Sequence, residues 1–181
     1  MASARDRVLD AYETLLIDHG AAAVTLDAVA AAAAVSKGGL LYHFASKDAL
    51  AAGLLDRLRE RSAADADAIR GAPDGPVAYY LRTSAPGGGV PGGVTRTYLA
   101  VLRLADGTTS GQAVREALAV VDADAFAALR EELADPVLAW LAQLVGDGLY
   151  LRTLTGTPLP PGLDVEDLLE RMRRVLLAGT D

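Results

Sequence analysis

The chain has 181 residues, of which 51% are hydrophobic and 5% aromatic, and its formal net charge is −7. That length allows one domain, or a headpiece of about 50 residues with a larger body. The negative net charge argues against a nucleic-acid-binding protein with a strongly basic surface, although binding depends only on the local field at the contact face.

The residue types exclude further classes of protein. The absence of cysteine rules out disulfides and thiolate metal sites. No apolar run approaches the roughly 20 residues that a membrane span needs, and the acidic residues Asp6 and Asp10 make the N-terminus unlike a signal peptide. We therefore expect a cytoplasmic protein with no membrane partner.

Apolar periodicity predicts helices along most of the chain. The first covers about residues 4–19 and ends at a Gly20 cap, and Thr25, Ser36 and Ser46 each serve as the N-cap of a further helix. The helix after Ser36 ends near Tyr42, and the one after Ser46 extends to about residue 70. Later helices are expected at about 77–83, 94–106, 110–134, 136–154 and 164–178, with loop-like segments at 84–94 and 155–163. The fold class is all-α, with a three-helix headpiece in residues 1–48 and a larger bundle in residues 49–181.

Residues 25–47 predict a helix-turn-helix, in which the second helix enters a DNA groove. The leading residues of that helix must be small or able to hydrogen-bond, and Lys37, Gly38 and Gly39 meet this need. Two glycines in a first helical turn cost roughly 1 kcal/mol each against alanine, which a close approach to DNA would explain. The spacing alone equally allows a helical hairpin without a DNA role, with Tyr42 and Phe44 as core aromatics.

Several side chains in this segment suit phosphate or base contacts. Lys37 can reach a guanine edge or a phosphate, and Tyr42 and His43 place hydrogen-bond donors at the end of the helix. Lys47 and Thr25 lie at helix starts, where free N–H groups favour a phosphate. Leu40 and Phe44 are predicted to face the core.

The order of these residues resembles the TetR family of bacterial transcriptional regulators. The matching residues are Thr25-Leu26, Val29-Ala30, Val35-Ser36-Lys37-Gly38, Leu41-Tyr42-His43-Phe44 and Ser46-Lys47-Asp48-Ala49-Leu50. The resemblance covers about the first 60 residues, and later residues match only in length, helical content and order. It implies that Lys37, Gly38, Gly39 and Leu41 face bases. It also implies that Thr25, Ser36, Tyr42, His43 and Lys47 hold phosphates.

Two positions depart from the family pattern. Ala34 lies in the turn, where the family often has glycine, and a positive φ there would cost alanine about 1 kcal/mol. Leu40 and Leu41 leave the recognition helix poor in hydrogen-bonding side chains. Sequence readout should therefore rely on methyl contacts, phosphates and DNA shape.

A headpiece with so few base contacts needs a second copy for specificity, so we expect a homodimer. Two late helices carry long apolar stripes, and the resemblance implies that they form a four-helix bundle with their mates. Gly146 and Gly148 would permit close helix approach. The predicted interface residues are Leu138, Leu141, Val145, Leu168, Leu169, Met172 and Val175. The alternative is that these stripes are core within one chain.

The resemblance also implies a small-molecule site among the middle helices. Its candidate residues are Tyr79, Tyr98, Leu102, Phe126 and Trp140. Each aromatic residue could instead be core. Arg82, Arg103 and Arg130 hint at an anionic ligand, although an arginine on a helix is usually solvated.

Other signals are weaker. The Gly87–Gly92 segment matches G-x-G-x-x-G by letter but has no preceding strand, so it is interpreted as a loop. Only two histidines exist, and no catalytic, metal or cofactor site is predicted. We expect a regulator that binds double-stranded operator DNA, most simply a repressor released by a small-molecule effector, and no enzyme. The alternatives are a helical ligand-binding or scaffold protein without a DNA role, and a helical enzyme that uses the body.

Overall fold

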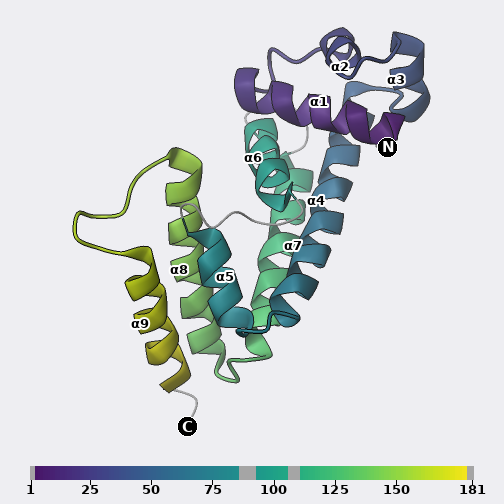
Figure 1. The fold of residues 1–181 in the computed structure, drawn as a ribbon. Coiled ribbons are helices and arrows are strands. Elements are labelled where there is room, and N and C mark those ends of the chain that lie inside the picture. Colours follow the sequence, from purple (N-terminus) through teal and green to yellow (C-terminus); the bar gives the residue numbers. More distant parts are fainter. Residues whose placement is uncertain (1–2, 86–92, 106–110, 179–181) are drawn as a thin grey trace. The chain divides into compact units, whose positions relative to one another are not determined.

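The computed structural model describes residues 3–85, 93–105 and 111–178, apart from the Leu177 side chain. These residues form helices and no strand, which confirms the all-α prediction (Figure 1). The helices are α1 (Ala4–His19), α2 (Leu26–Ala32), α3 (Lys37–His43), α4 (Lys47–Arg70), α5 (Pro76–Ser84), α6 (Val94–Ala105), α7 (Gly111–Arg130), α8 (Pro136–Thr155) and α9 (Val165–Ala178). Helix α7 ends before the predicted residue 134. The predicted Gly87–Gly92 loop lies outside the described residues.

The predicted caps set the helix starts. The hydroxyl oxygens of Thr25, Ser36 and Ser46 accept hydrogen bonds from the third N–H of the helix that follows, at 3.2, 3.0 and 3.0 Å. Gly20 ends α1 with a φ of +72°, in the left-handed region that favours glycine. Each cap satisfies a backbone group that the helix itself leaves unpaired.

The chain divides into two compact units. Unit 1 contains residues 1–61 and 93–120, and unit 2 contains residues 62–92 and 121–181. The divisions fall within α4 and α7. The headpiece boundary predicted after residue 48 remains a prediction, and it lies inside unit 1.

In unit 1, α1 packs against α2, α3 and α6 (Figure 1). Its buried face carries Val8, Leu9, Tyr12 and Leu16, all fully buried. Burial of such side chains supplies roughly 1.5–3 kcal/mol each before entropy is counted. The inner face of the helix-turn-helix is thereby held on α1.

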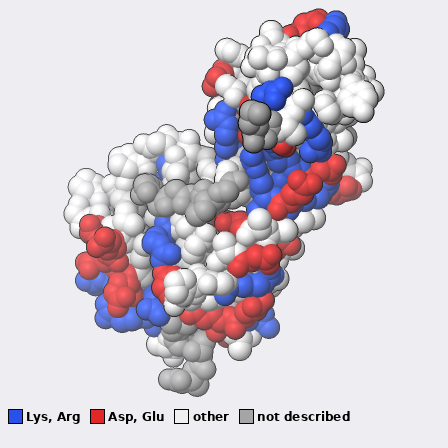
Figure 2. Space-filling view, turned by 45° about the vertical axis from the view of Figure 1, so that its right-hand side comes forward, with Lys and Arg blue, Asp and Glu red and all other residues white. Residues whose placement is uncertain are grey.

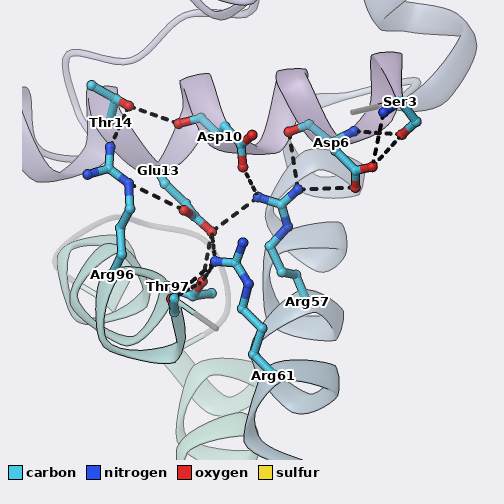
Figure 3. Close-up of polar contacts among 10 residues, drawn as sticks. Ser3, Asp6, Asp10, Glu13, Thr14, Arg57, Arg61, Arg96 and Thr97 are labelled. Atoms are coloured by element: carbon cyan, nitrogen blue, oxygen red, sulfur yellow. Dashed lines mark hydrogen bonds and ion pairs between the residues drawn. The ribbon is translucent and has the colours of Figure 1, made fainter. Parts of the chain in front are cut away.

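A network of buried charges ties α1 to α4 and α6 (Figure 3). Glu13 is 1% exposed and accepts hydrogen bonds from Arg61 at 3.0 Å and Thr97 at 2.8 Å. Arg57, whose side chain is 7% exposed, bonds Asp10 at 2.6 Å and Glu13 at 3.3 Å. Arg57 also pairs with Asp6, and Arg96 with Glu13. Every buried charge in this network faces an opposite charge, which burial requires.

In unit 2, α5 packs against α8 and α9 (Figure 1). The core combines Val77, Leu81, Leu129, Leu133, Ala139, Ala142 and Leu176. A Cβ added to Gly146 would lie 2.2 Å from Cε1 of Tyr80. The close approach predicted at Gly146 therefore occurs within the chain, between α8 and Tyr80, whereas Gly148 has nothing within 4 Å.

Candidate nucleic-acid interface

The turn between α2 and α3 contains a strained residue. Ala34 has a φ of +53°, so the positive φ considered from the sequence is confirmed, with its cost of about 1 kcal/mol. Hydrogen bonds from Ala34 to the Ala31 carbonyl, at 3.1 Å, and from Val35 to the Ala30 carbonyl, at 3.0 Å, hold the turn. The turn directs α3 away from α2 despite the missing glycine.

Helix α3 has a buried face and an exposed face. Leu40 is fully buried and Phe44 is 4% exposed, as predicted. A Cβ added to Gly53 would lie 2.5 Å from the Phe44 ring. The glycine therefore leaves the space that the ring occupies. Tyr42 is 85% exposed, which contradicts its alternative interpretation as a core aromatic.

The exposed face presents the residues predicted to approach bases. Lys37, Gly38 and Leu41 are exposed, and Gly39 is half-buried. Nothing lies within 4 Å of a Cβ built on Gly38, so the backbone is open to a groove there. The open backbone at Gly38 agrees with the expectation that the two glycines let the helix backbone approach DNA closely.

Lys37 already has a partner that the sequence interpretation missed. Its Nζ lies 2.9 Å from Oδ1 of Asp27, and the two side chains are 60% and 69% exposed. The sequence placed Asp27 only as a favourable acid in the first turn of a helix. Asp27 therefore competes with a base or a phosphate for the Lys37 ammonium, or shares its three N–H donors with it.

The predicted phosphate contacts are geometrically available. The hydroxyl oxygens of Thr25 and Ser36 accept cap hydrogen bonds, which leaves each hydroxyl proton to donate. Tyr42 and His43 are both exposed, with ring centroids 5.2 Å apart in an edge-to-face arrangement. Lys47 donates to the Ala21 carbonyl at 2.8 Å, which places its ammonium at the loop that follows α1.

The charge around this face is mixed. Residues 1–61 hold seven Lys and Arg residues against eight Asp and Glu residues. In Figure 2 the end of the molecule that carries α2 and α3 is mostly white, and the larger blue groups lie below it. The balance of charges in residues 1–61 indicates that attraction to DNA depends on where individual donors lie.

The predicted dimer residues fall into two groups. Leu138, Val145, Leu169 and Met172 pack against the core of unit 2, and Leu168 is half-buried. Leu141 and Val175 are 45% and 68% exposed. The exposed apolar stripe of α8, which we call the α8 stripe, consists of Val137, Trp140, Leu141, Leu144 and Leu151.

The predicted ligand residues are divided between the units. Tyr98 and Leu102 lie on α6 in unit 1, whereas Tyr79, Phe126 and Trp140 lie in unit 2. Phe126 and Trp140 meet edge to face, with centroids 6.1 Å apart. The arginines that hinted at an anion are occupied in two cases, since Arg82 pairs with Asp74 and Arg130 donates to the Ala134 carbonyl. Arg103 is exposed.

The described residues contain neither a candidate metal site nor a helix that could span a membrane. Within the described ranges, no group of three or more Asp, Glu or His side chains could hold a metal ion. No helix in the same ranges has the length and apolarity to cross a bilayer.

A short helix pair with a buried inner face and an exposed second helix, in an all-helical chain, defines a helix-turn-helix DNA-binding regulator. Residues 8–54 match the family described as bacterial regulatory proteins, tetR family. The matched segment therefore resembles a TetR-family DNA-binding domain, and the chain is a DNA-binding transcriptional regulator.

Similar solved structures extend the likeness to the whole chain. The multidrug binding protein EbrR complexed with imidazole is 28% identical, with 97% of this chain and 96% of that chain covered and a TM-score of 0.63. EbrR complexed with ethidium is 27% identical, with 96% of this chain and 98% of that chain covered and a TM-score of 0.61. A TetR-family member from Streptomyces coelicolor A3 is 27% identical, with 96% and 98% covered and a TM-score of 0.68. No curated protein sequence matches the chain.

Proposed function

We propose that the protein is a cytoplasmic homodimeric repressor that a small-molecule effector releases from its operator, and that it acts without catalysis. The observation that carries the DNA-binding assignment is the two-faced helix α3, with Leu40 buried and Tyr42 85% exposed. In this proposal Lys37, Gly38, Gly39 and Leu41 face bases. Thr25, Ser36, Tyr42, His43 and Lys47 contact phosphates.

The DNA interface is tested by selecting binding sites from a randomised pool of double-stranded DNA. We expect an inverted repeat, because two copies of α3 read two half-sites. Lys47→Ala and Tyr42→Phe should each weaken binding about tenfold on every sequence, and Lys37→Ala should relax the preference at one position. Arg171→Ala on α9, with an exposed side chain, is the matched loss of one positive charge. Equal binding by all four variants and the unchanged protein would contradict the interface.

The dimer proposal rests on the α8 stripe and on Val175 of α9. A row of large apolar side chains at 45–68% exposure is typical of a surface that another protein surface covers. Leu144→Glu should halve the mass seen in sedimentation. Leu163→Glu is the matched control, because both leucines are 47% exposed and Leu163 precedes α9. A dimer that survives Leu144→Glu together with Leu141→Glu would place the interface elsewhere.

The effector proposal is supported by the ligands of EbrR, which is described as a multidrug binding protein and was solved with imidazole and with ethidium. We propose that residues of unit 2, among them Tyr79, Phe126 and Trp140, contribute to the effector site. The effector would stabilise a dimer whose α3 helices no longer match the half-sites. Addition of an effector should then release DNA in a gel-shift assay.

A further inference from the structure

A hydrogen-bond donor and an acceptor lie side by side at the start of α3. Nζ of Lys37, the first residue of α3, lies 2.9 Å from Oδ1 and 3.1 Å from Oδ2 of Asp27 in α2. Both side chains are exposed, and the space around Gly38, the next residue, is open. The two side chains, called the Lys37–Asp27 pair below, therefore form one exposed unit on the face that the proposed interface turns toward bases.

The position of Asp27 is not explained by its own helix. The start of α2 is capped by Thr25, whose hydroxyl oxygen accepts from the Ala28 N–H at 3.2 Å. Among the described residues the Asp27 carboxylate accepts no backbone N–H, and it reaches ten residues along the chain to Lys37 instead. A lone carboxylate at this face would repel phosphates, whereas the adjacent ammonium offsets its charge. The pairing therefore lets an acceptor approach DNA.

The pair keeps most of its hydrogen-bonding capacity. A lysine ammonium has three N–H donors, and a carboxylate has about four lone-pair sites. One N–H directed at Asp27 holds the pair, so two donors of Lys37 and further acceptor sites of Asp27 stay available. Within the described ranges neither side chain has another hydrogen-bond or ion-pair partner. The pair therefore offers, in a fixed order, two donors followed by an acceptor.

One base pair has the complementary order. In the major groove a G·C pair presents the guanine acceptors N7 and O6 and then the cytosine N4 donor. O6 and N4 are hydrogen-bonded to each other, so they lie about 2.9 Å apart. Nζ of Lys37 and Oδ1 of Asp27 have the same spacing, 2.9 Å. Lys37 can therefore donate to N7 and O6 while Asp27 accepts from N4.

The other base pairs leave the pair mismatched. A·T and T·A place the adenine N6 amino group between two acceptors, so a donor of Lys37 would face another donor. The inverted C·G pair reverses the order, so the Asp27 carboxylate would face the guanine O6. Donors that face donors and acceptors that face acceptors lose hydrogen bonds to water without replacement. The pair therefore distinguishes G·C in one orientation from the three alternatives.

We propose that Asp27 is a specificity-determining residue, which together with Lys37 reads one G·C base pair in each half-site of the operator. Lys37 donates to N7 and O6 of the guanine, and Asp27 accepts from N4 of the cytosine. The inference rests on the proposed interface, in which Lys37 faces bases. It adds a second reader from α2 and names the base pair that the two residues read together.

The test changes single atoms of the DNA. Operators selected from randomised DNA with the unchanged full-length protein should carry one G·C pair of fixed orientation per half-site, whose preference Lys37→Ala relaxes. At that pair 7-deazaguanine removes the N7 acceptor, and N4-methylcytosine replaces the N4–H that faces the groove while Watson–Crick pairing is kept. Each analogue should weaken binding about tenfold in fluorescence anisotropy. This arm needs no variant beyond the one that identifies the position.

Variants then assign each DNA atom to a side chain. In Asp27→Ala the penalty of N4-methylcytosine should disappear while that of 7-deazaguanine persists, and Lys37→Ala should remove the penalty of 7-deazaguanine. Asp48→Ala is the matched control, because Asp48 is also an exposed acid in a first helical turn, that of α4, and both penalties should persist in it. Each penalty is a ratio within one protein, so a general gain in affinity from the lost negative charge cancels. Far-UV circular dichroism checks that each variant is helical.

The outcomes separate this inference from the proposed function. Operators without a fixed G·C pair, or an N4-methylcytosine penalty that is absent or equal in Asp27→Ala and the unchanged protein, would overturn the reading by Asp27. The proposed interface would still stand if Tyr42→Phe and Lys47→Ala weaken binding to those operators. A pool that yields no preferred sequence with the unchanged protein would overturn both proposals.

Discussion

The two units treat buried charge in opposite ways. In unit 1, Glu13 and Arg57 are buried against opposite charges, so the network holds α1, α4 and α6 in register. In unit 2, the buried Oδ1 of Asp65 has no hydrogen-bond partner among the described residues, and burial raises the pKa of its carboxyl to about 6. The paired network therefore stabilises unit 1, whereas the ionised Asp65 carboxylate costs unit 2 free energy that protonation recovers.

The largest expected effect comes from breaking the paired network. Glu13→Gln leaves Arg57 and Arg61 facing an amide, and removal of one partner of a buried charge pair costs about 3–5 kcal/mol. Urea unfolding measures this loss, with Glu60→Gln on the exposed face of α4 as the control. A loss for Glu13→Gln below about 1 kcal/mol would mean that the network does not hold unit 1.

The same neutralisation in unit 2 should have the opposite sign. The pKa of Asp65 is raised to about 6 from its ordinary 3.8, so the folded state binds more protons than the unfolded state between these values. Stability therefore falls as pH rises from about 4 to about 6. Asp65→Asn removes that loss, and we expect it to stabilise the protein by roughly 1–2 kcal/mol at pH 8 and little at pH 4.

The check is urea unfolding at pH 4 and pH 8, with Asp167→Asn measured in parallel. The gain from Asp65→Asn should appear only at the higher pH, and the control should change little at either. A variant that is less stable at both values would show that the Asp65 carboxylate is stabilising, which would remove the contrast between the units.

A third comparison concerns strain in the backbone of unit 1. Ala34→Gly relieves a positive φ and should raise stability by up to about 1 kcal/mol, less the entropy that glycine adds to the unfolded chain. Ala32→Gly, in α2, should lower it by about 1 kcal/mol. Thermal unfolding compares the pair, and equal losses for both would mean that Ala34 is unstrained.

The smallest expected effect on stability concerns an exposed pair. Asp27→Asn frees Lys37 and removes a negative charge beside the proposed DNA face, so operator affinity should rise about threefold to tenfold at low salt. The free energy of unfolding should change by less than about 0.5 kcal/mol. Fluorescence anisotropy with labelled operator measures the affinity. Weaker binding would indicate that Asp27 positions Lys37 for DNA.

Local signals made the helices predictable. The N-caps were predictable because each capping hydroxyl bonds a backbone N–H only three residues later, as at Thr25, Ser36 and Ser46. The core position of Leu40 follows from helical spacing. The hydrogen bond from Tyr80 on α5 to Asp147 on α8 was missed because the two residues are far apart in the sequence and meet only in the fold.

Hydrophobic periodicity also could not show which surface each apolar side chain of α8 packs against. It predicted that Leu138 and Val145 belong to an apolar stripe of α8, but one helix can carry two such faces. The structure places these two residues on core and leaves Leu144 and Trp140 exposed. Burial of Glu13 within α1 was likewise invisible, because a carboxylate becomes an interior residue only when remote arginines reach it.

The Lys37–Asp27 pair has a consequence for how the protein travels along DNA. In the proposed interface Asp27 competes with a phosphate for the Lys37 ammonium, so we expect Lys37 to contribute little to non-specific attraction. We then expect short residence on random sequence. A guanine edge that accepts from Lys37 beside or in place of Asp27 would favour the operator.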